Sequence, residues 1–188
     1  MSRPLRIEYP GTLYHVVSRG NGKLWLFKHD DAYSMFLDIL GEYIKKYHVV
    51  IHNFVIMRNH FHLVVGTKSA NLGLFMNQVL SHYAMYFNRV SRRRGSVFQS
   101  RYGAFLVQKD VYYKQLTKYV FYNPVKARLV KRPDEYKWSS LGGNWGRELG
   151  SNLYILHICR ASPVKKLPLI LFFSLHFEIY DETFGSSF

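Results

Sequence analysis

Residues 49–65 read VVIHNFVIMRNHFHLVV and contain two runs of β-forming side chains. Valine, isoleucine and phenylalanine dominate both runs, and Arg58-Asn59 separates them as a short break. The pattern predicts a hairpin in which residues 49–57 form one strand and residues 60–65 form its partner. The segments on either side of this hairpin indicate which fold it belongs to.

Two histidines occupy alternate positions of the second predicted strand. Because side chains alternate along a strand, the imidazoles of His60 and His62 lie on one face, about 7 Å apart at Cα, and Phe61 points into the core. This geometry suits two ligands of one metal ion. However, nine histidines in 188 residues supply about 0.4 His-x-His patterns by chance. Two half-buried structural histidines are therefore the alternative interpretation.

Strand and helix patterns alternate around the hairpin. The expected elements are a strand at 12–18, a helix capped by Asp30 or Asp31 that reaches residue 47, the hairpin, a helix from its cap Asn71 to residue 90, a strand at 98–107, and a helix from its cap Asp110 to about Tyr122. This order contains the β-α-β-β-α-β arrangement of ferredoxin-like sheets. We predict an α+β fold, with a ferredoxin-like antiparallel sheet and an extra helix, over residues 1–150. Residues 151–188 lack this periodicity and are interpreted as a C-terminal extension.

The composition limits the class of protein. Lysine and arginine number 26 against 12 acidic residues, a net charge of +14 that favours nucleic acid as partner, ahead of an anionic membrane surface. A basic protein without a polyanionic partner is the alternative. Cys159 is the only cysteine, which excludes an intrachain disulfide and a thiolate zinc cluster. The most apolar run, residues 167–177, is shorter than the roughly 20 residues of a membrane helix, so we expect a cytoplasmic protein.

The last predicted helix, DVYYKQLTKYVFYNP, carries a possible nucleophile. Tyr119 and Asn123 lie four residues apart and so share one helix face. A phenol beside an amide oxygen suits a metal–phosphate site, with Tyr119 as nucleophile and Asn123 as a third metal ligand. The alternatives are a core tyrosine and, because Asn123 precedes Pro124, an ordinary C-terminal cap.

Two groups of residues are candidates for DNA binding. In the first, cations surround a turn together with aromatic side chains: Arg89, Arg92, Arg93, Arg94, Arg101, Phe98 and Tyr102. Cations neutralise phosphates while aromatic faces stack on unpaired bases, a combination typical of single-strand binding. The second group is Arg3, Arg6, Arg19 and Asn21. A solvated surface of charges is the alternative for each arginine.

Five blocks together carry a family resemblance. They are the histidine pair with Phe61, an N-terminal block between Ile7 and Asn21, Phe98–Tyr102, Tyr119–Ala127 and Tyr136–Ser140. Through these blocks, which follow the expected order along the chain over about residues 3–145, the chain resembles the single-tyrosine transposases related to IS200, and most of all the branch associated with repetitive extragenic palindromes (REP).

The resemblance implies a function and a site. It implies a ferredoxin-like histidine-hydrophobic-histidine endonuclease in which Tyr119 attacks a phosphate of single-stranded or hairpin DNA, leaving a 5′-phosphotyrosine and a free 3′-hydroxyl, before a second transfer reseals the strand. It also implies that His60, His62 and Asn123 hold Mg²⁺ or Mn²⁺. The alternatives are a hairpin-binding protein that lost the reaction and a ferredoxin-like RNA-binding module with exposed sheet aromatics. A homodimer is left open, and neither a membrane nor a protein partner is implied.

Overall fold

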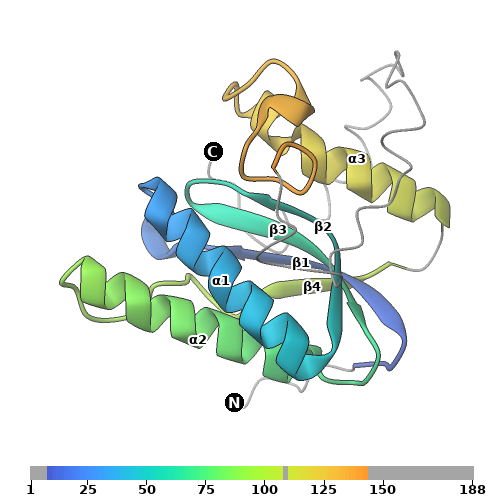
Figure 1. The fold of residues 1–188 in the computed structure, drawn as a ribbon, viewed down its shortest axis with the longest axis horizontal. Helices are drawn as coiled ribbons and strands as arrows, with labels where there is room; N and C mark the ends of the chain where they lie inside the picture. The colour runs from blue at the N-terminus through green and yellow to red at the C-terminus, as the bar shows by residue number, and fades with distance from the viewer. Residues whose placement is uncertain (1–7, 108–109, 144–188) are drawn as a thin grey trace. The chain divides into compact units, whose positions relative to one another are not determined.

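The sheet has four strands in the order β2-β3-β1-β4, each antiparallel to its neighbours. The structure is a computed structural model that describes residues 8–107 and 110–143. The strands are β1 (Thr12–Arg19), β2 (Val49–Ile56), β3 (His60–Thr67) and β4 (Gly103–Leu106), and the helices are α1 (Asp30–Tyr47), α2 (Leu72–Val90) and α3 (Asp110–Lys126). This is the predicted α+β, ferredoxin-like arrangement, with α3 as the extra helix (Figure 1).

Helices α1 and α2 lie together on one side of the sheet, and α3 lies on the other (Figure 1). The first side is the main core, since the ring of Phe61 in β3 contacts that of Phe36 in α1 at 4.9 Å between centroids, and both side chains are fully buried. Full burial of a side chain of this size contributes about 1.5–3 kcal/mol. Alternation along β3 therefore leaves His60 and His62 on the α3 side.

The predicted helix caps are only partly correct. Asp30 and Asp31 lie in the first turn of α1, where their charges suit the helix dipole, but the N-cap is His29. Asn71 is the N-cap residue of α2, yet its side-chain amide donates to the carbonyl of Tyr47 and does not cap the helix. The Glu8 carboxylate instead accepts a hydrogen bond, at 2.7 Å, from the backbone N–H of Gly73 in the first turn.

Helix α3 extends further than predicted. We expected Asn123-Pro124 to end it, but the helix continues through Pro124 to Lys126. Proline has no N–H, so the carbonyl of Val120 loses its usual partner in the next turn. The Asn123 side-chain Nδ2 donates to that carbonyl at 3.4 Å and to the carbonyl of Tyr119 at 2.9 Å. Asn123 is therefore inside the helix, and the predicted C-terminal cap is wrong.

Polar contacts attach α3 to the sheet. Asn53 of β2 is 2% exposed, and its Nδ2 donates to Thr117 Oγ1 at 2.9 Å and to the Tyr113 hydroxyl at 3.2 Å. The edge of β2 is covered by the segment after α3, where the Ile56 N–H donates to the Trp138 carbonyl at 2.9 Å. This covering protects an edge strand from pairing with another chain.

The strand predicted at 98–107 is shorter in the structure. Within residues 98–107, only β4 (Gly103–Leu106) forms a ladder with β1. Phe98 forms only an isolated bridge to Gly20, and the Gln99 N–H donates to the Arg19 carbonyl at 3.0 Å. The predicted extension at 151–188 lies outside the described residues. In residues 8–107 and 110–143, no helix is long and apolar enough to cross a membrane.

Candidate active site

Side chains from three distant segments meet between the sheet and α3. His60 and His62 of β3 have ring centroids 5.2 Å apart, and the ring of Tyr119 in α3 lies 5.6 Å from that of His62. His15 of β1 completes the group, with its ring 6.3 Å from that of Tyr119. The structure thus places the ring of the predicted nucleophile beside that of His62, which itself lies beside His60.

His15 is the member of this group that the sequence did not reveal. Its Nε2 lies 3.1 Å from Nδ1 of His62, the two rings are stacked, and both residues are 2% exposed. From the sequence, His15 lies on a strand and could border the site, but packing is its expected role. The missing information was strand register: β1 pairs with β3 so that Val17 faces His62, which puts His15 on the same sheet face.

Hydrogen bonds orient both predicted ligand histidines. His60 Nδ1 lies 2.8 Å from Oδ1 of Asn59, an atom that only accepts, so His60 carries its proton on Nδ1. His62 Nδ1 is engaged with His15. In His60, Nε2 is therefore the nitrogen that can present a lone pair to a cation, and the same holds for His62 when its Nδ1 donates to His15, because a partner at one ring nitrogen determines what the other can do.

The histidines are held in their neutral form. Burial, helped by the nearby positive charge of Arg19, lowers the pKa of His60 to about 4. Burial lowers the pKa of His62 well below its usual value, and His60, His15 and Lys126 lower it further. Both imidazoles are consequently uncharged near pH 7, which is the form that binds metal ions.

Three residues of α3 share the face that carries Tyr119. Asn123 and Lys126 follow Tyr119 by four and seven residues, and the Lys126 ammonium lies 4.9 Å from the centre of the Tyr119 ring. Burial lowers the pKa of Lys126. Since the Asn123 amide nitrogen donates to helix carbonyls, its Oδ1 is the atom that can act as an acceptor or ligand.

The donor set limits what kind of metal site these residues can form. Within the described ranges, no group of three or more His, Cys, Asp or Glu side chains is arranged to hold a metal ion. A metal ion bound to His60 and His62 therefore needs a ligand of another kind, and the amide oxygen of Asn123 is the candidate. Two imidazoles and an amide oxygen suit a divalent ion such as Mn²⁺ or Mg²⁺.

Of the predicted DNA-binding residues, Arg19 lies next to this group, and Asn21 follows it by two residues in the chain. Arg19 faces His60 across the β1–β3 pair, and its Nε donates to Oε1 of Gln99. Asn21 is exposed, and its backbone N–H donates to the Val97 carbonyl at 2.9 Å. Arg3 and Arg6, predicted to belong to the same patch, lie outside the described residues.

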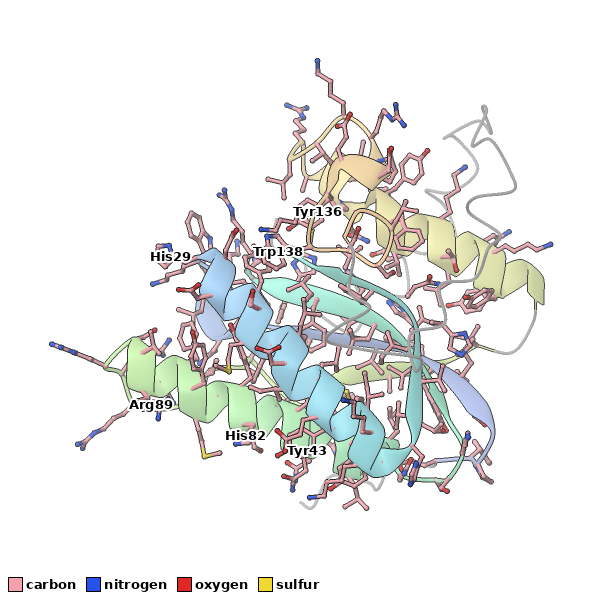
Figure 2. The ribbon with its side chains drawn as sticks, viewed as in Figure 1. His29, Tyr43, His82, Arg89, Tyr136 and Trp138 are labelled. Atoms are coloured by element: carbon pink, nitrogen blue, oxygen red, sulfur yellow. The ribbon has the colours of Figure 1, made fainter. Side chains whose placement is uncertain are left out.

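The other predicted patch lies at the end of α2, where Figure 2 shows Arg89 pointing outward. Four of its arginines are exposed and Arg93 is half-buried; the exposed ones are Arg89, Arg92, Arg94 and Arg101. Phe98 and Tyr102 are 9% and 7% exposed. Their rings are therefore buried, and the predicted stacking of bases on them does not fit the structure, because stacking needs an accessible face.

Comparison with known proteins identifies the family. Residues 9–123 match the family model described as "Transposase IS200 like", which is more than half of the chain. The chain belongs to the IS200-like transposase family. In this IS200-like transposase the matched segment contains His15, both strand β3 histidines, Tyr119 and Asn123.

A solved structure with a TM-score of 0.64 supports the fold. The transposase is similar to a REP-associated tyrosine transposase bound to a REP hairpin, with 17% identity, a TM-score of 0.64, and coverage of 79% of this chain and 88% of that chain. It is also similar to a putative transposase from Deinococcus radiodurans R1, with 14% identity, a TM-score of 0.44, and coverage of 64% and 94%. No curated protein sequence matches the chain at a significant level.

Proposed function

We propose that this transposase is a metal-dependent endonuclease and strand transferase for single-stranded hairpin DNA, with Tyr119 as its nucleophile. The observation that carries the proposal is the position of the Tyr119 ring, 5.6 Å from the ring of His62. A phenol on α3 and two oriented, neutral imidazoles on β3 meet there, although nearly 60 residues separate them in the chain.

The ligands of the proposed metal ion are Nε2 of His60, Nε2 of His62 and Oδ1 of Asn123. Imidazole ligands favour Mn²⁺ over Mg²⁺ in intrinsic affinity, whereas cellular abundance favours Mg²⁺. When bound, the ion polarises the scissile phosphate and offsets the negative charge that develops there. The protein's own contribution is to hold these three atoms in position before the DNA arrives.

The proposed reaction exchanges one phosphodiester for another. The Tyr119 oxygen bonds to phosphorus, the bond from phosphorus to the 3′ oxygen breaks, and that oxygen leaves with a proton as a 3′-hydroxyl. The 5′-phosphotyrosine keeps the energy of the broken bond, so an incoming 3′-hydroxyl can reseal the strand. A phenol with a pKa near 10 is mostly protonated at pH 7. The Lys126 ammonium, 4.9 Å from the ring, is placed to favour the developing phenolate.

Hairpin DNA is the proposed substrate for two reasons. The net charge of +14 favours a polyanionic partner. The similar REP-associated transposase is bound to a REP hairpin, which indicates the form of DNA that this fold can hold. The RNA-binding alternative is not supported, because the described strand aromatics Tyr14, Phe54 and Phe61 are buried and Phe105 is half-buried.

A covalent adduct tests the proposal. The protein is incubated with an oligonucleotide that carries a hairpin and single-stranded flanks, with Mn²⁺ or Mg²⁺, and the products are separated under denaturing conditions. We expect a protein–DNA adduct that Tyr119→Phe abolishes while hairpin binding is retained. Tyr122→Phe is the matched control, since Tyr122 is also half-buried on α3 and has Lys118 above its ring at 5.8 Å. An adduct that persists in Tyr119→Phe rules out this nucleophile.

The same assay separates the enzyme from the non-catalytic alternative. A hairpin-binding protein that has lost the reaction binds the oligonucleotide but forms no adduct with either metal ion. Substituting His60 by alanine should abolish the stimulation of cleavage by metal. Unchanged metal-dependent cleavage in that variant contradicts the proposed ligands.

A further inference from the structure

An exposed tryptophan lies near the predicted active site with an arginine over its ring. The Trp25 side chain is 53% exposed, and the Arg58 guanidinium carbon lies 5.2 Å from its ring centre. Among the described residues, only Trp25 and Tyr9 are aromatic members of the set of exposed large hydrophobic side chains. Large aromatic side chains normally lie in cores or interfaces, so this exposure calls for an explanation.

Core packing does not account for Trp25. The next two residues, Leu26 and Phe27, are fully buried, so the same short segment supplies core side chains and turns the indole outward. Where the fold uses an indole for packing, it buries it: Trp138 is 8% exposed and stacks on Tyr33 at 4.4 Å between centroids.

The segment that carries Trp25 is held firmly against the turn between β2 and β3. The Gly20 N–H donates to the Asn59 carbonyl at 2.8 Å, and the Phe27 N–H donates to the Arg58 carbonyl at 2.9 Å. Inside the segment, a Cβ on Gly20 would lie 2.2 Å from the Leu24 carbonyl oxygen, so only glycine permits this close approach. Fixed backbone lowers the entropy lost when a ligand binds.

The same turn carries His60. Arg58 lies two residues before this proposed metal ligand, and Asn59, which accepts from Gly20, also orients the His60 ring through its side chain. The segment that carries Trp25 and the residue His60 are therefore attached to one short turn.

The local charge is positive. Residues 9–29 contain no aspartate or glutamate, and this segment with the adjoining turn contributes Arg19, Lys23, Lys28 and Arg58; Asp30 and Asp31 follow at the start of α1, where Asp30 is paired with Lys137. A basic surface with an accessible aromatic ring is the combination by which proteins bind single-stranded nucleic acid: cations follow the backbone and bases stack on the ring.

We propose that Trp25 and Arg58 form a binding site for an unpaired nucleotide of the single-stranded DNA that flanks the hairpin. The indole stacks on the base, and the guanidinium contacts the neighbouring phosphate. Stacking tolerates any base, so this site contributes affinity and position rather than sequence selection. The inference rests on the proposed function in assuming that the flanking strand reaches the turn that carries His60.

Binding measurements without metal test this site. Fluorescence polarisation in EDTA compares two labelled oligonucleotides, the hairpin alone and the same hairpin with single-stranded flanks. Trp25→Ala should weaken binding of the flanked oligonucleotide at least about fivefold, the lower limit for one base stacked on an aromatic side chain, and should leave the bare hairpin unaffected. Trp25→Phe should retain most of the affinity.

Arg58 has its own readout. Arg58→Ala should weaken binding of the flanked oligonucleotide and reduce the slope of log affinity against log salt by about one. Lys137→Ala is the matched control, because the Lys137 ammonium also lies over an indole, that of Trp138, at 4.5 Å, but there the ring is buried. The control should bind both oligonucleotides like the wild type.

Three outcomes overturn the inference: flanks that add no affinity in the wild type, unchanged affinity for the flanked oligonucleotide in Trp25→Ala, or equal losses on both oligonucleotides. Thermal unfolding of each variant shows whether a loss reflects folding. Because no metal is present, failure of the proposed cleavage does not affect this readout. Conversely, a Trp25→Ala protein that still forms the Tyr119 adduct and binds the flanked oligonucleotide like the wild type contradicts the proposed Trp25 site. That result does not contradict the proposed reaction.

Discussion

Replacing His15 by phenylalanine removes the hydrogen bond that orients His62 while keeping a ring of similar size in β1. The bond is 3.1 Å long and both residues are 2% exposed, so His62 Nδ1 is left buried without this partner. An unsatisfied buried polar group costs about 1–3 kcal/mol of unfolding free energy. Loss of a group that orients a metal-binding histidine typically lowers metal affinity about 10- to 100-fold.

Two measurements follow these effects separately. Urea unfolding without metal reports the free energy of unfolding, and calorimetric titration with Mn²⁺ reports the affinity of the site. His15→Gln should recover much of both, because its side-chain amide can either accept from or donate to Nδ1 of His62. His82→Ala is the control: His82 is bonded to the Tyr43 hydroxyl at 3.0 Å on the α1–α2 side (Figure 2), so Mn²⁺ affinity should be unchanged.

The result that refutes this reasoning is wild-type Mn²⁺ affinity in His15→Phe. If His15→Gln binds Mn²⁺ as weakly as His15→Phe, the hydrogen bond is not what positions His62, and the shape of the imidazole would have to be responsible.

Three further predictions concern the same side of the sheet. Lys126→Ala should slow adduct formation about tenfold or more in single-turnover assays, since a charge beside the developing phenolate is lost, and Lys126→Arg should be less affected; equal rates in all three proteins contradict a role for the charge. Asn53→Ala should lower the free energy of urea unfolding by about 1–3 kcal/mol, because Thr117 and Tyr113 of α3 lose their shared partner, and an unchanged midpoint would show that α3 is held otherwise. The pKa of His60 is about 4 in the folded protein, below the ordinary 6.5, so between these pH values the unfolded chain binds more protons than the folded one. The free energy of unfolding should therefore fall as pH drops from 6.5 toward 4 and should not change with pH above 6.5. Unfolding measured as a function of pH should show a smaller fall in His60→Phe.

The elements with strong local patterns were predictable. The hairpin around Arg58-Asn59 follows from alternating apolar residues, a pattern that is read within a few residues. The four-strand order follows from the order of strands and helices along the chain. The end of α3 was not predictable in this way. Pro124 indicates a helix end, and only the bonds from the Asn123 side chain to the preceding carbonyls show how the helix continues.

Exposure also depended on tertiary contacts. Phe98 and Tyr102 lie among arginines in the sequence, which favours a stacking surface, but packing buries both rings. Trp25 shows the opposite case, because nothing in its neighbours distinguishes an exposed indole from a core one. The fraction of a side chain that is exposed is determined by segments distant in sequence.

The sequence by itself determined the sheet, the common face of His60 and His62, and the common helix face of Tyr119 and Asn123, because backbone geometry repeats every two residues in a strand and every 3.6 in a helix. Only the tertiary structure placed the two faces against each other and brought His15 of β1 next to His62 and Tyr119. Strand register and helix docking come from packing and hydrogen bonds between residues far apart in the chain, such as Asn53 with α3, and no local repeat encodes those contacts.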